Sequence, residues 1–259
     1  MVKLAAWNVN SIKARLPNVL AWLDEASPDV VLLQELKCQD DSFPRLEFEE
    51  RGYNCLVKGQ KSYNGVAILS KDTLEDPLQE LPGDDGSDEQ ARYVETTTFG
   101  IRVASIYLPN GNPLNSEKFS YKLRWMQRLF SHSRTLLASE QPVVLGGDYN
   151  VIPEGRDCYD VDAWKDDALF QPESRAALRR VVYGGYTDAY RALHPDQTRA
   201  FTYWDYQRGA WDADHGIRID HLLLSPQAAD RLEDCEIDKG PRGESKASDH
   251  TPIWCEIAA

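Results

Sequence analysis

Apolar residues along this chain fall into two patterns. Short continuous runs, at residues 3–9, 29–34 and 66–70, predict strands that are buried on both faces. Between the first two runs, apolar residues return every three or four positions over residues 14–26, which predicts a helix that Pro28 ends. The alternation of strand and helix predicts an α/β protein.

The rest of the chain repeats this theme without a segment that resembles a linker. Further strands are predicted at residues 53–57, 93–99, 101–107, 142–146, 199–204, 216–224, 235–238 and 251–257, and further helices at 116–139 and 172–183. Strands grouped in both halves, with helices between them, predict two packed β-sheets flanked by helices, in one domain over residues 1–259. The acidic loop at 81–89 is expected to be mobile, solvated and without function.

Composition narrows the class of protein. Hydrophobic residues make up 42% of 259 residues, enough for a large core, and no apolar run approaches the length of a membrane span. The first residues lack the apolar segment of a secretory signal. Five scattered cysteines without a CxxC pair predict reduced thiols, a cytoplasmic location and no structural zinc site.

The formal charge of −13 argues against tight, nonspecific binding to nucleic acid, because such binding depends on neutralising phosphates with Lys and Arg. It does not exclude a nuclease. Acidic residues around a divalent cation add negative charge, while local groups of Lys and Arg still contact a phosphate backbone.

Polar side chains interrupt the apolar strands where the strands end, which predicts a site on one rim of the sheets. The residues at these ends are Asn8, Asn10, Glu35, Tyr107, Asp148 and Asn150. Gly146 and Gly147 are expected to let the backbone turn tightly before Asp148. Because Mg²⁺ prefers oxygen ligands, Glu35 is the expected principal ligand, with Asn8 and Asp249 nearby.

Each of these residues also has an ordinary structural interpretation. Asn8 and Asn10 are typical of turns, and Glu35 alone is equally consistent with a surface acid. Asp220 is harder to explain, since it follows an apolar residue in a predicted strand and a buried carboxylate needs a partner. His250 is the expected partner, whereas His221 points to the opposite strand face and is expected to be structural.

Nine segments, in order along nearly the whole chain, resemble those of the exonuclease III family of apurinic/apyrimidinic endonucleases. These belong to the wider endonuclease/exonuclease/phosphatase superfamily, and the resemblance is to its bacterial type. The segments span residues 7–10, 33–37, 59–61, 65–69, 107–111, 146–150, 201–206, 218–220 and 248–250. The resemblance implies a four-layer α/β sandwich with the site at one end of the two sheets.

The resemblance also implies roles for individual residues. The implied catalytic residues are Tyr107, Asp148, Asn150, Asp220 and His250. The implied metal site comprises Asn8, Glu35 and Asp249, together with Asp148, Asn150 and His250. Aromatic residues expected against an extrahelical abasic sugar are Tyr203, Trp204 and Trp211. Either Asp148 or His250 is positioned to accept the proton of the attacking water, and Asp148 is favoured because Asp220 should hold His250 as a cation.

The implied activity is Mg²⁺-dependent or Mn²⁺-dependent incision of duplex DNA 5′ to abasic sites, with 3′→5′ exonuclease and 3′-phosphatase activity. We expect a cytoplasmic, nucleoid-associated monomer that does not bind membranes. Candidate contacts to the DNA backbone are Lys58, Lys61, Arg92, Lys118, Lys122, Arg208 and Lys246. Two alternatives are a phosphoesterase acting on phospholipid head groups and a noncatalytic nucleic-acid-binding regulator on the same fold.

Overall fold

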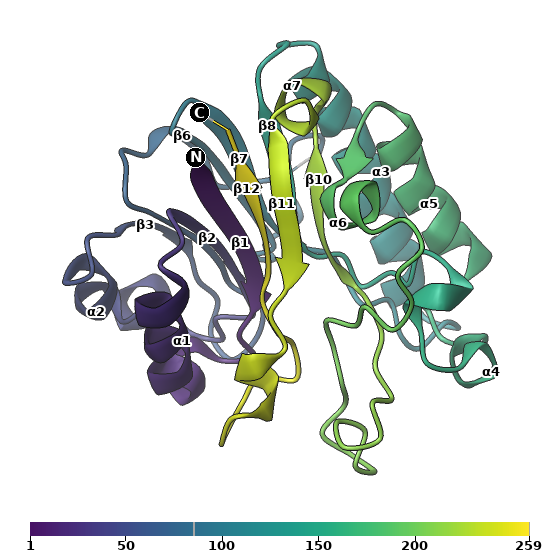
Figure 1. Ribbon diagram of the computed structural model, residues 1–259. Coiled ribbons are helices and arrows are strands. Elements are labelled where there is room, and N and C mark those ends of the chain that lie inside the picture. The colour runs from purple at the N-terminus through teal and green to yellow at the C-terminus, as the bar shows by residue number, and fades with distance from the viewer. Residues whose placement is uncertain (85, 259) are drawn as a thin grey trace.

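The computed structural model describes residues 1–84 and 86–258. Two mixed six-stranded sheets pack face to face, and helices cover the outer face of each sheet (Figure 1). This arrangement confirms the predicted four-layer α/β sandwich. In the described ranges, no helix is both long enough and apolar enough to cross a membrane.

The first sheet has the strand order β11-β12-β1-β2-β4-β3. Central strand β1 runs antiparallel to β12 and parallel to β2, so the carboxyl ends of β1 and β2 share one edge. The strands are β1 (Val2–Asn8), β2 (Val30–Gln34), β3 (Asn54–Lys58), β4 (Val66–Ser70), β11 (Leu232–Ile237) and β12 (Ile253–Ile257).

The second sheet has the order β5-β6-β7-β8-β10-β9. Strands β7 and β8 are parallel, and β10 returns antiparallel beside β8, so β10 begins at the edge where β7 and β8 end. The strands are β5 (Glu75–Leu78), β6 (Tyr93–Thr98), β7 (Ile101–Tyr107), β8 (Val143–Asp148), β9 (Thr187–Asp188) and β10 (Asp220–Leu224).

Helices form the two outer layers (Figure 1). Helices α1 (Ile12–Ala26) and α2 (Arg45–Glu49) lie outside the first sheet, and α3 (Glu117–Leu137) and α5 (Pro172–Tyr183) lie outside the second. The Ser116 side chain caps α3 by accepting a hydrogen bond from the Lys118 amide. Shorter elements are α4 (Val161–Trp164), α6 (Ala189–Leu193), α7 (Pro226–Ala229), η1 (Asp40–Ser42), η2 (Gly155–Asp157) and η3 (Gly240–Gly243).

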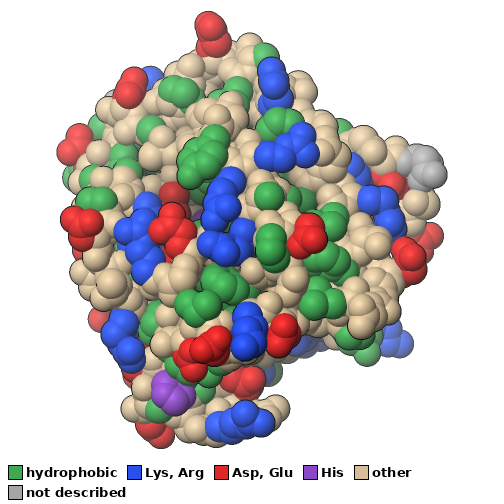
Figure 2. All heavy atoms as spheres, turned by 90° about the vertical axis from the view of Figure 1, so that its right-hand side faces the viewer, with side chains coloured by type: hydrophobic (Ala, Val, Ile, Leu, Met, Phe, Trp, Pro, Cys, Tyr) green, Lys and Arg blue, Asp and Glu red, His purple; other side chains and the backbone are tan. Residues whose placement is uncertain are grey.

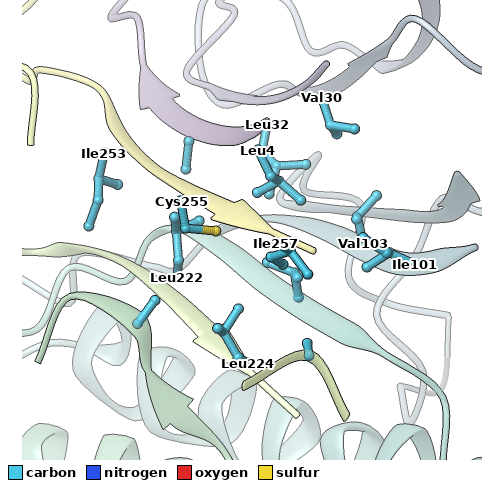
Figure 3. Packing of buried hydrophobic residues seen from close by; sticks show 14 of the residues in the cluster. Leu4, Val30, Leu32, Ile101, Val103, Leu222, Leu224, Ile253, Cys255 and Ile257 are labelled. Carbon is cyan, nitrogen blue, oxygen red and sulfur yellow. The ribbon is translucent and has the colours of Figure 1, made fainter. Parts of the chain in front are cut away.

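The main core lies between the sheets (Figure 3). Leu4 and Leu32 from the first sheet and Leu222 from the second are fully buried there. A Cβ atom on Gly146 would lie 2.6 Å from Leu32 Cδ1 and 2.7 Å from Leu222 Cδ2, so the close approach of the sheets requires glycine. The packing therefore fixes how the strand ends of one sheet face those of the other.

Several predicted elements were wrong. Residues 199–204 do not form a strand, since Tyr203 makes only isolated bridges to Ile217 and His250. The strand predicted at 216–224 begins only at Asp220. Strands β5 and β9 and the short helices were missed because each is too short to show a period.

The acidic loop also differs from its expectation. Leu81 is buried, and the Asp88 carboxylate accepts hydrogen bonds from Tyr121 and Arg128 of α3. Gly146 and Gly147 lie inside β8 rather than in a turn. A Cβ on Gly147 would overlap the Ile106 carbonyl at 2.1 Å, so this glycine serves close strand packing.

Candidate active site

A cleft of about 310 Å³ opens at the shared edge of the two sheets. The strand register builds it, because Tyr107, Asp148 and Asp220 are direct partners in one row across β7, β8 and β10. Facing this row, Glu35 follows the last residue of β2. The residues that line the cleft are Glu35, Tyr107, Asn110, Asp148, Asn150, Trp164, Asp167, Leu169, Tyr203, Asp205, Ile219, Asp249 and His250.

Left-handed backbone turns the chain at two of these strand ends. Glu35 has φ 54° and Asn150 has φ 46°, values that are uncommon for residues other than glycine. Leu36, after Glu35, is bonded through its amide to the Gly65 carbonyl, and the Asn150 amide donates to Asp148 Oδ1 at 2.8 Å. Both turns are thus held by hydrogen bonds and aim polar side chains into the cleft.

The buried Asn8 side chain joins the two sheets at the site. Its Nδ2 donates to Glu35 Oε1 and to Asp148 Oδ2, both at 2.9 Å, and its Oδ1 accepts from the Asn10 amide at 3.0 Å. Asn8 therefore fixes the separation of the two carboxylates. These contacts show that Asn8 positions the two acids, and it stays a predicted member of the cation site that they would form.

Asp148 is a carboxylate in an environment that disfavours its charge. Burial raises its pKa to about 7, and nearby Asp220 adds to the rise, while His250 and hydrogen bonds from Asn150 and Asn8 oppose it. Asn150 Nδ2 lies 3.2 Å from Asp148 Oδ2. A carboxylate with a pKa near 7 is suited to accept a proton at neutral pH.

His250 lies between two acids. Its Nδ1 donates to Asp220 Oδ2 at 2.8 Å, and its Nε2 lies 3.8 Å from Asp148 Oδ2. Burial alone would lower the pKa of His250, but Asp220 and Asp148 outweigh burial and raise it to about 10. The other oxygen of Asp220, Oδ1, has no hydrogen-bond partner among the described residues.

His250 has two predicted roles, one as a metal ligand and one as the partner of Asp220. The ligand atoms of Glu35, Asp148 and His250 lie within 4.8 Å of one another, close enough to hold one metal ion. A protonated imidazole, however, has no lone pair to offer a metal. The raised pKa of His250 therefore favours its role in the Asp–His pair, and the set of residues that ligate the cation stays a prediction.

Glu35 is held as an anion. Burial opposes its charge, but Lys37 and the Asn8 hydrogen bond prevail and lower its pKa. Lys37 Nζ lies 2.8 Å from Glu35 Oε2 and also donates to Asn10 Oδ1. Asn10 in turn donates to Asp249 Oδ1 at 3.0 Å, which brings Asp249 to the rim of the same group of oxygens. The carboxylates of Glu35 and Asp148, bridged by the Asn8 amide, together with the Asp249 carboxylate beside them, are suitable ligands for a hard divalent cation such as Mg²⁺.

Tyr107, which lines the same cleft, keeps its proton. Burial, followed by the charges of Glu35 and Asp148, raises the pKa of Tyr107 well above its usual range. The Arg92 guanidinium lies 4.7 Å from the ring centroid and donates to the Tyr107 carbonyl at 3.3 Å. Tyr107 is thus a fixed hydroxyl donor, and Arg92 is a half-buried residue that supports it.

The predicted DNA contacts divide by exposure. Lys61, Lys118, Arg208 and Lys246 are exposed, and Lys58 is half-buried with its Nζ 3.8 Å from Glu80. Two predictions need correction because the side chains are fully buried. Lys122 donates to the carbonyls of Asn110 and Asn150, and Trp204 donates to Asp214 Oδ1. Neither side chain presents surface to a DNA strand.

The other two aromatic candidates keep part of their surface exposed. Tyr203 lines it and packs its ring edge-on against His250, with centroids 4.9 Å apart. Trp211 is half-buried and packs against Trp204, with centroids 4.8 Å apart. The Arg242 guanidinium, 5.4 Å from the Trp211 ring centroid, supports that ring from the other side.

Sequence reasoning missed part of the cleft wall. Trp164 and Asp167 line it, and the buried indole N–H of Trp164 has no hydrogen-bond partner among the described residues. Trp164 ends the four-residue helix α4 and Asp167 follows it in a bend, and neither element is long enough to show a period in the sequence. The buried Lys122 did leave a signal, since it interrupts the apolar stripe of α3 between Phe119 and Met126.

Comparisons with known proteins agree with this geometry. A model of the endonuclease/exonuclease/phosphatase family matches residues 5–250. Exodeoxyribonuclease III of Haemophilus influenzae is 33% identical over 267 residues, covering 99% of this chain and all of the relative. An AP endonuclease structure from Archaeoglobus fulgidus matches with TM-score 0.95 and 35% identity, and the structure of the 3′ phosphatase NExo from Neisseria bound to product DNA hairpin matches with 0.96 and 36%. Both cover all of each chain.

Proposed function

Because this chain belongs to the endonuclease/exonuclease/phosphatase family, we propose that it is a metal-dependent DNA-repair nuclease of the exodeoxyribonuclease III type. Its reaction is hydrolysis of a phosphodiester bond in duplex DNA, 5′ to an abasic site or at a 3′ end. The observation that carries the proposal is Asp148, a buried carboxylate with a pKa near 7 in a cleft that also holds Glu35 and His250.

Each polar residue of the cleft has a separate role in the proposed reaction. Asp148 Oδ2 takes a proton from a water whose oxygen attacks phosphorus, and the bond from phosphorus to the leaving 3′-oxygen breaks. Asn150 orients that water beside Asp148. His250, held as a cation by Asp220, and the Tyr107 hydroxyl stabilise the negative charge that develops on the phosphate oxygens.

Glu35 and Asp148, joined through Asn8, are the residues that would hold a divalent cation, with Asp249 at the rim. Such a cation, Mg²⁺ or Mn²⁺ with the same oxygen preference, would supply positive charge that offsets the negative charge of the phosphate and of the leaving oxygen. Because Lys37 already keeps Glu35 ionised, the chain presents this carboxylate ready for a cation.

An abasic nucleotide suits the cleft because it has no base to unpair or unstack before it enters. Tyr203 and Ile219 give the cleft an apolar side, and Trp164 lies on its wall. Exposed Lys61 and Lys118 are the proposed contacts to the DNA backbone, with Arg208 and Lys246 as further candidates. We propose that the protein acts as a monomer beside the chromosome in the cytoplasm.

The test is cleavage of an end-labelled duplex that carries one abasic-site analogue, beside an undamaged duplex and a duplex with a 3′-phosphate. We expect Mg²⁺-dependent incision 5′ to the lesion, abolished by EDTA and by Glu35→Ala. Stepwise loss of nucleotides from both unblocked duplexes would make exonuclease action primary. If folded protein cleaves none of the three with Mg²⁺ or Mn²⁺, the proposal is wrong, and assays with phospholipid head groups and with nucleic-acid binding alone would follow.

A further inference from the structure

A second, smaller pocket lies on the outer side of the molecule, away from the cleft. It has a volume of about 160 Å³ and is bounded by α5, α6 and the segment 153–157. No residue that lines it also lines the active-site cleft. Figure 2 shows the side of the molecule that faces right in Figure 1, where Lys and Arg side chains gather near the middle beside hydrophobic side chains.

The charges around this pocket do not balance, although the chain as a whole is strongly acidic. The pocket is lined by five arginines and three carboxylates: Arg156, Arg175, Arg179, Arg191 and Arg218, with Glu154, Asp157 and Asp188. His221, which also lines it, is held neutral because burial and then Arg218 lower its pKa to about 4. The lining therefore carries two more positive than negative charges at neutral pH.

All three carboxylates already have partners. Arg218 lies 2.7 Å from Asp157 and 2.8 Å from Asp188, and both it and Asp157 are almost fully buried. Arg191 also pairs with Asp157, and Arg156 lies 2.8 Å from Glu154. These pairs form the floor and one side of the pocket and use three of the five arginines.

The two remaining arginines share one face of α5. Arg175 and Arg179 are four residues apart, so they are neighbours on the helix surface, where like charges repel. Arg175 uses only its Nε, which donates to the Pro153 carbonyl at 3.0 Å, while its guanidinium lies 4.5 Å from the centroid of the Phe170 ring. In residues 1–84 and 86–258, the guanidinium of Arg179 has neither an ion pair nor a hydrogen bond.

The same helix face continues into an exposed aromatic ring. Tyr183 lies four residues after Arg179, lines the pocket and has 81% of its surface exposed. Leu178 and Val182 give the pocket an apolar wall beside it. A ring this exposed gains nothing from the core, whereas it offers a flat surface to a planar group bound next to the arginines.

We propose that this pocket binds a phosphomonoester dianion, either inorganic phosphate or the phosphate of a deoxynucleoside 5′-monophosphate. Guanidinium groups match phosphate oxygens in pairs, and a dianion supplies the two charges that the lining lacks. A volume of about 160 Å³ accepts a phosphate group but not a whole nucleotide, so the base of a nucleotide would lie outside, against Tyr183. The site does not depend on the proposed nuclease activity.

The test is calorimetric titration of the full chain, in EDTA, with inorganic phosphate and separately with deoxythymidine 5′-monophosphate. Arg179→Glu should weaken binding of both by about tenfold or more, since it replaces a charge-assisted donor with a repelling charge. Arg180→Glu is the matched control, because Arg180 is the next residue of the same helix but points to Gln127 and Phe130 instead. It should leave both affinities unchanged.

Tyr183→Ala separates the two ligand sources. If the nucleotide is the ligand, this variant removes the excess affinity of the nucleotide over phosphate and leaves phosphate binding unchanged. Equal affinities of wild type for the two ligands would identify inorganic phosphate. The proposal is overturned if wild type binds neither ligand at millimolar concentration. It is also overturned if Arg179→Glu, folded by circular dichroism, binds both as tightly as Arg180→Glu, which would place the anion in the cleft.

Discussion

Two buried carboxylate–histidine clusters lie in or against the second sheet, and they behave in opposite ways. In one, Glu95 of β6 accepts hydrogen bonds from Tyr93 and Arg102 and lies 2.8 Å from His132 Nε2. In the other, Asp148 faces His250 at 3.8 Å and has Asp220 as a second acidic neighbour. The same chemical groups therefore occur in the same layer of the fold with different surroundings.

The pKa values record the difference. Burial disfavours the charge of Glu95, but the hydrogen bonds of His132, Tyr93 and Arg102 prevail and lower its pKa to about 2. For Asp148, burial prevails and raises the pKa to about 7. Glu95 is an anion that pairs with Arg102 and stabilises the fold, whereas Asp148 accepts hydrogen bonds from neutral amides beside a second carboxylate, Asp220, and is ready to take a proton. The charge of the neighbouring groups, rather than burial or residue type, separates structure from function here.

The largest expected effect is on catalysis. Asp220→Asn removes the charge that holds His250 as a cation, so kcat should fall by about 10²-fold or more. The same change breaks the buried pair of Asp220 with His250, so the free energy of unfolding should fall as well, and kcat is compared per folded molecule. Single-turnover cleavage and thermal unfolding of one preparation measure both. Unchanged kcat would remove Asp220 from the catalytic account.

Glu95→Gln should lower stability without lowering the rate per folded molecule. It leaves Arg102 and His132 without their anionic partner, and breaking a buried ion pair costs about 3–5 kcal/mol of unfolding free energy. The rate per folded molecule should stay near that of wild type, because Glu95 does not line the cleft. Urea unfolding with active-site titration checks this. A stable variant with lost activity would refute the division into two clusters.

The two clusters should also separate by pH. Activity needs ionised Asp148 and protonated His250. Therefore kcat/KM should rise with pH up to about 7, the pKa of Asp148, and fall near 10, the pKa of His250. A bound cation would lower the pKa of Asp148 and shift the rise to lower pH. The Glu95 contribution to stability has the sign of a depressed acid. It is fully present above the unfolded pKa near 4.5 and is lost as pH falls towards about 2. A rate that is flat from pH 6 to 10.5 would contradict the assignment.

The smallest effects concern DNA capture. Lys61→Ala and Lys118→Ala should each weaken binding modestly and reduce the slope of log K against log salt by about 1, if each contacts one phosphate. Lys71→Ala is a suitable control, since Lys71 is also exposed but its Nζ bonds the Ser27 carbonyl, far along the sheet from the cleft. Slopes equal to that of wild type would remove these lysines from the interface.

The sequence predicted the parts of the site that strands determine. Glu35, Asp148 and Asp220 lie at or next to strand ends. Because side chains alternate between the two faces of a strand, the strand register determines which face each of these acids occupies. The resemblance to the family supplied their roles. The single-domain assignment stays a prediction.

What could not be predicted depends on irregular segments and on packing between distant residues. Trp164 enters the cleft from a helix too short to show a period, and Trp204 is buried by a loop whose path depends on Asp214 and Trp211. Residue type alone predicts that Lys122 lies on the surface. Instead it is buried, and its ammonium group donates hydrogen bonds to two backbone carbonyls. The hydrogen-bond partners of these side chains lie elsewhere along the chain, so a local pattern can mark a position, as the apolar stripe of α3 does for Lys122, but it does not reveal the partners.

Asp148→Asn tests the central claim most directly. We would measure its single-turnover rate on an abasic duplex with Mg²⁺ and its thermal unfolding midpoint at pH 7. We predict a rate lower by about 10²- to 10⁴-fold, the usual contribution of a general base. The midpoint should be equal to or higher than that of wild type, because the substitution removes a buried charge. Near wild-type turnover would contradict the claim that Asp148 is the base of this site.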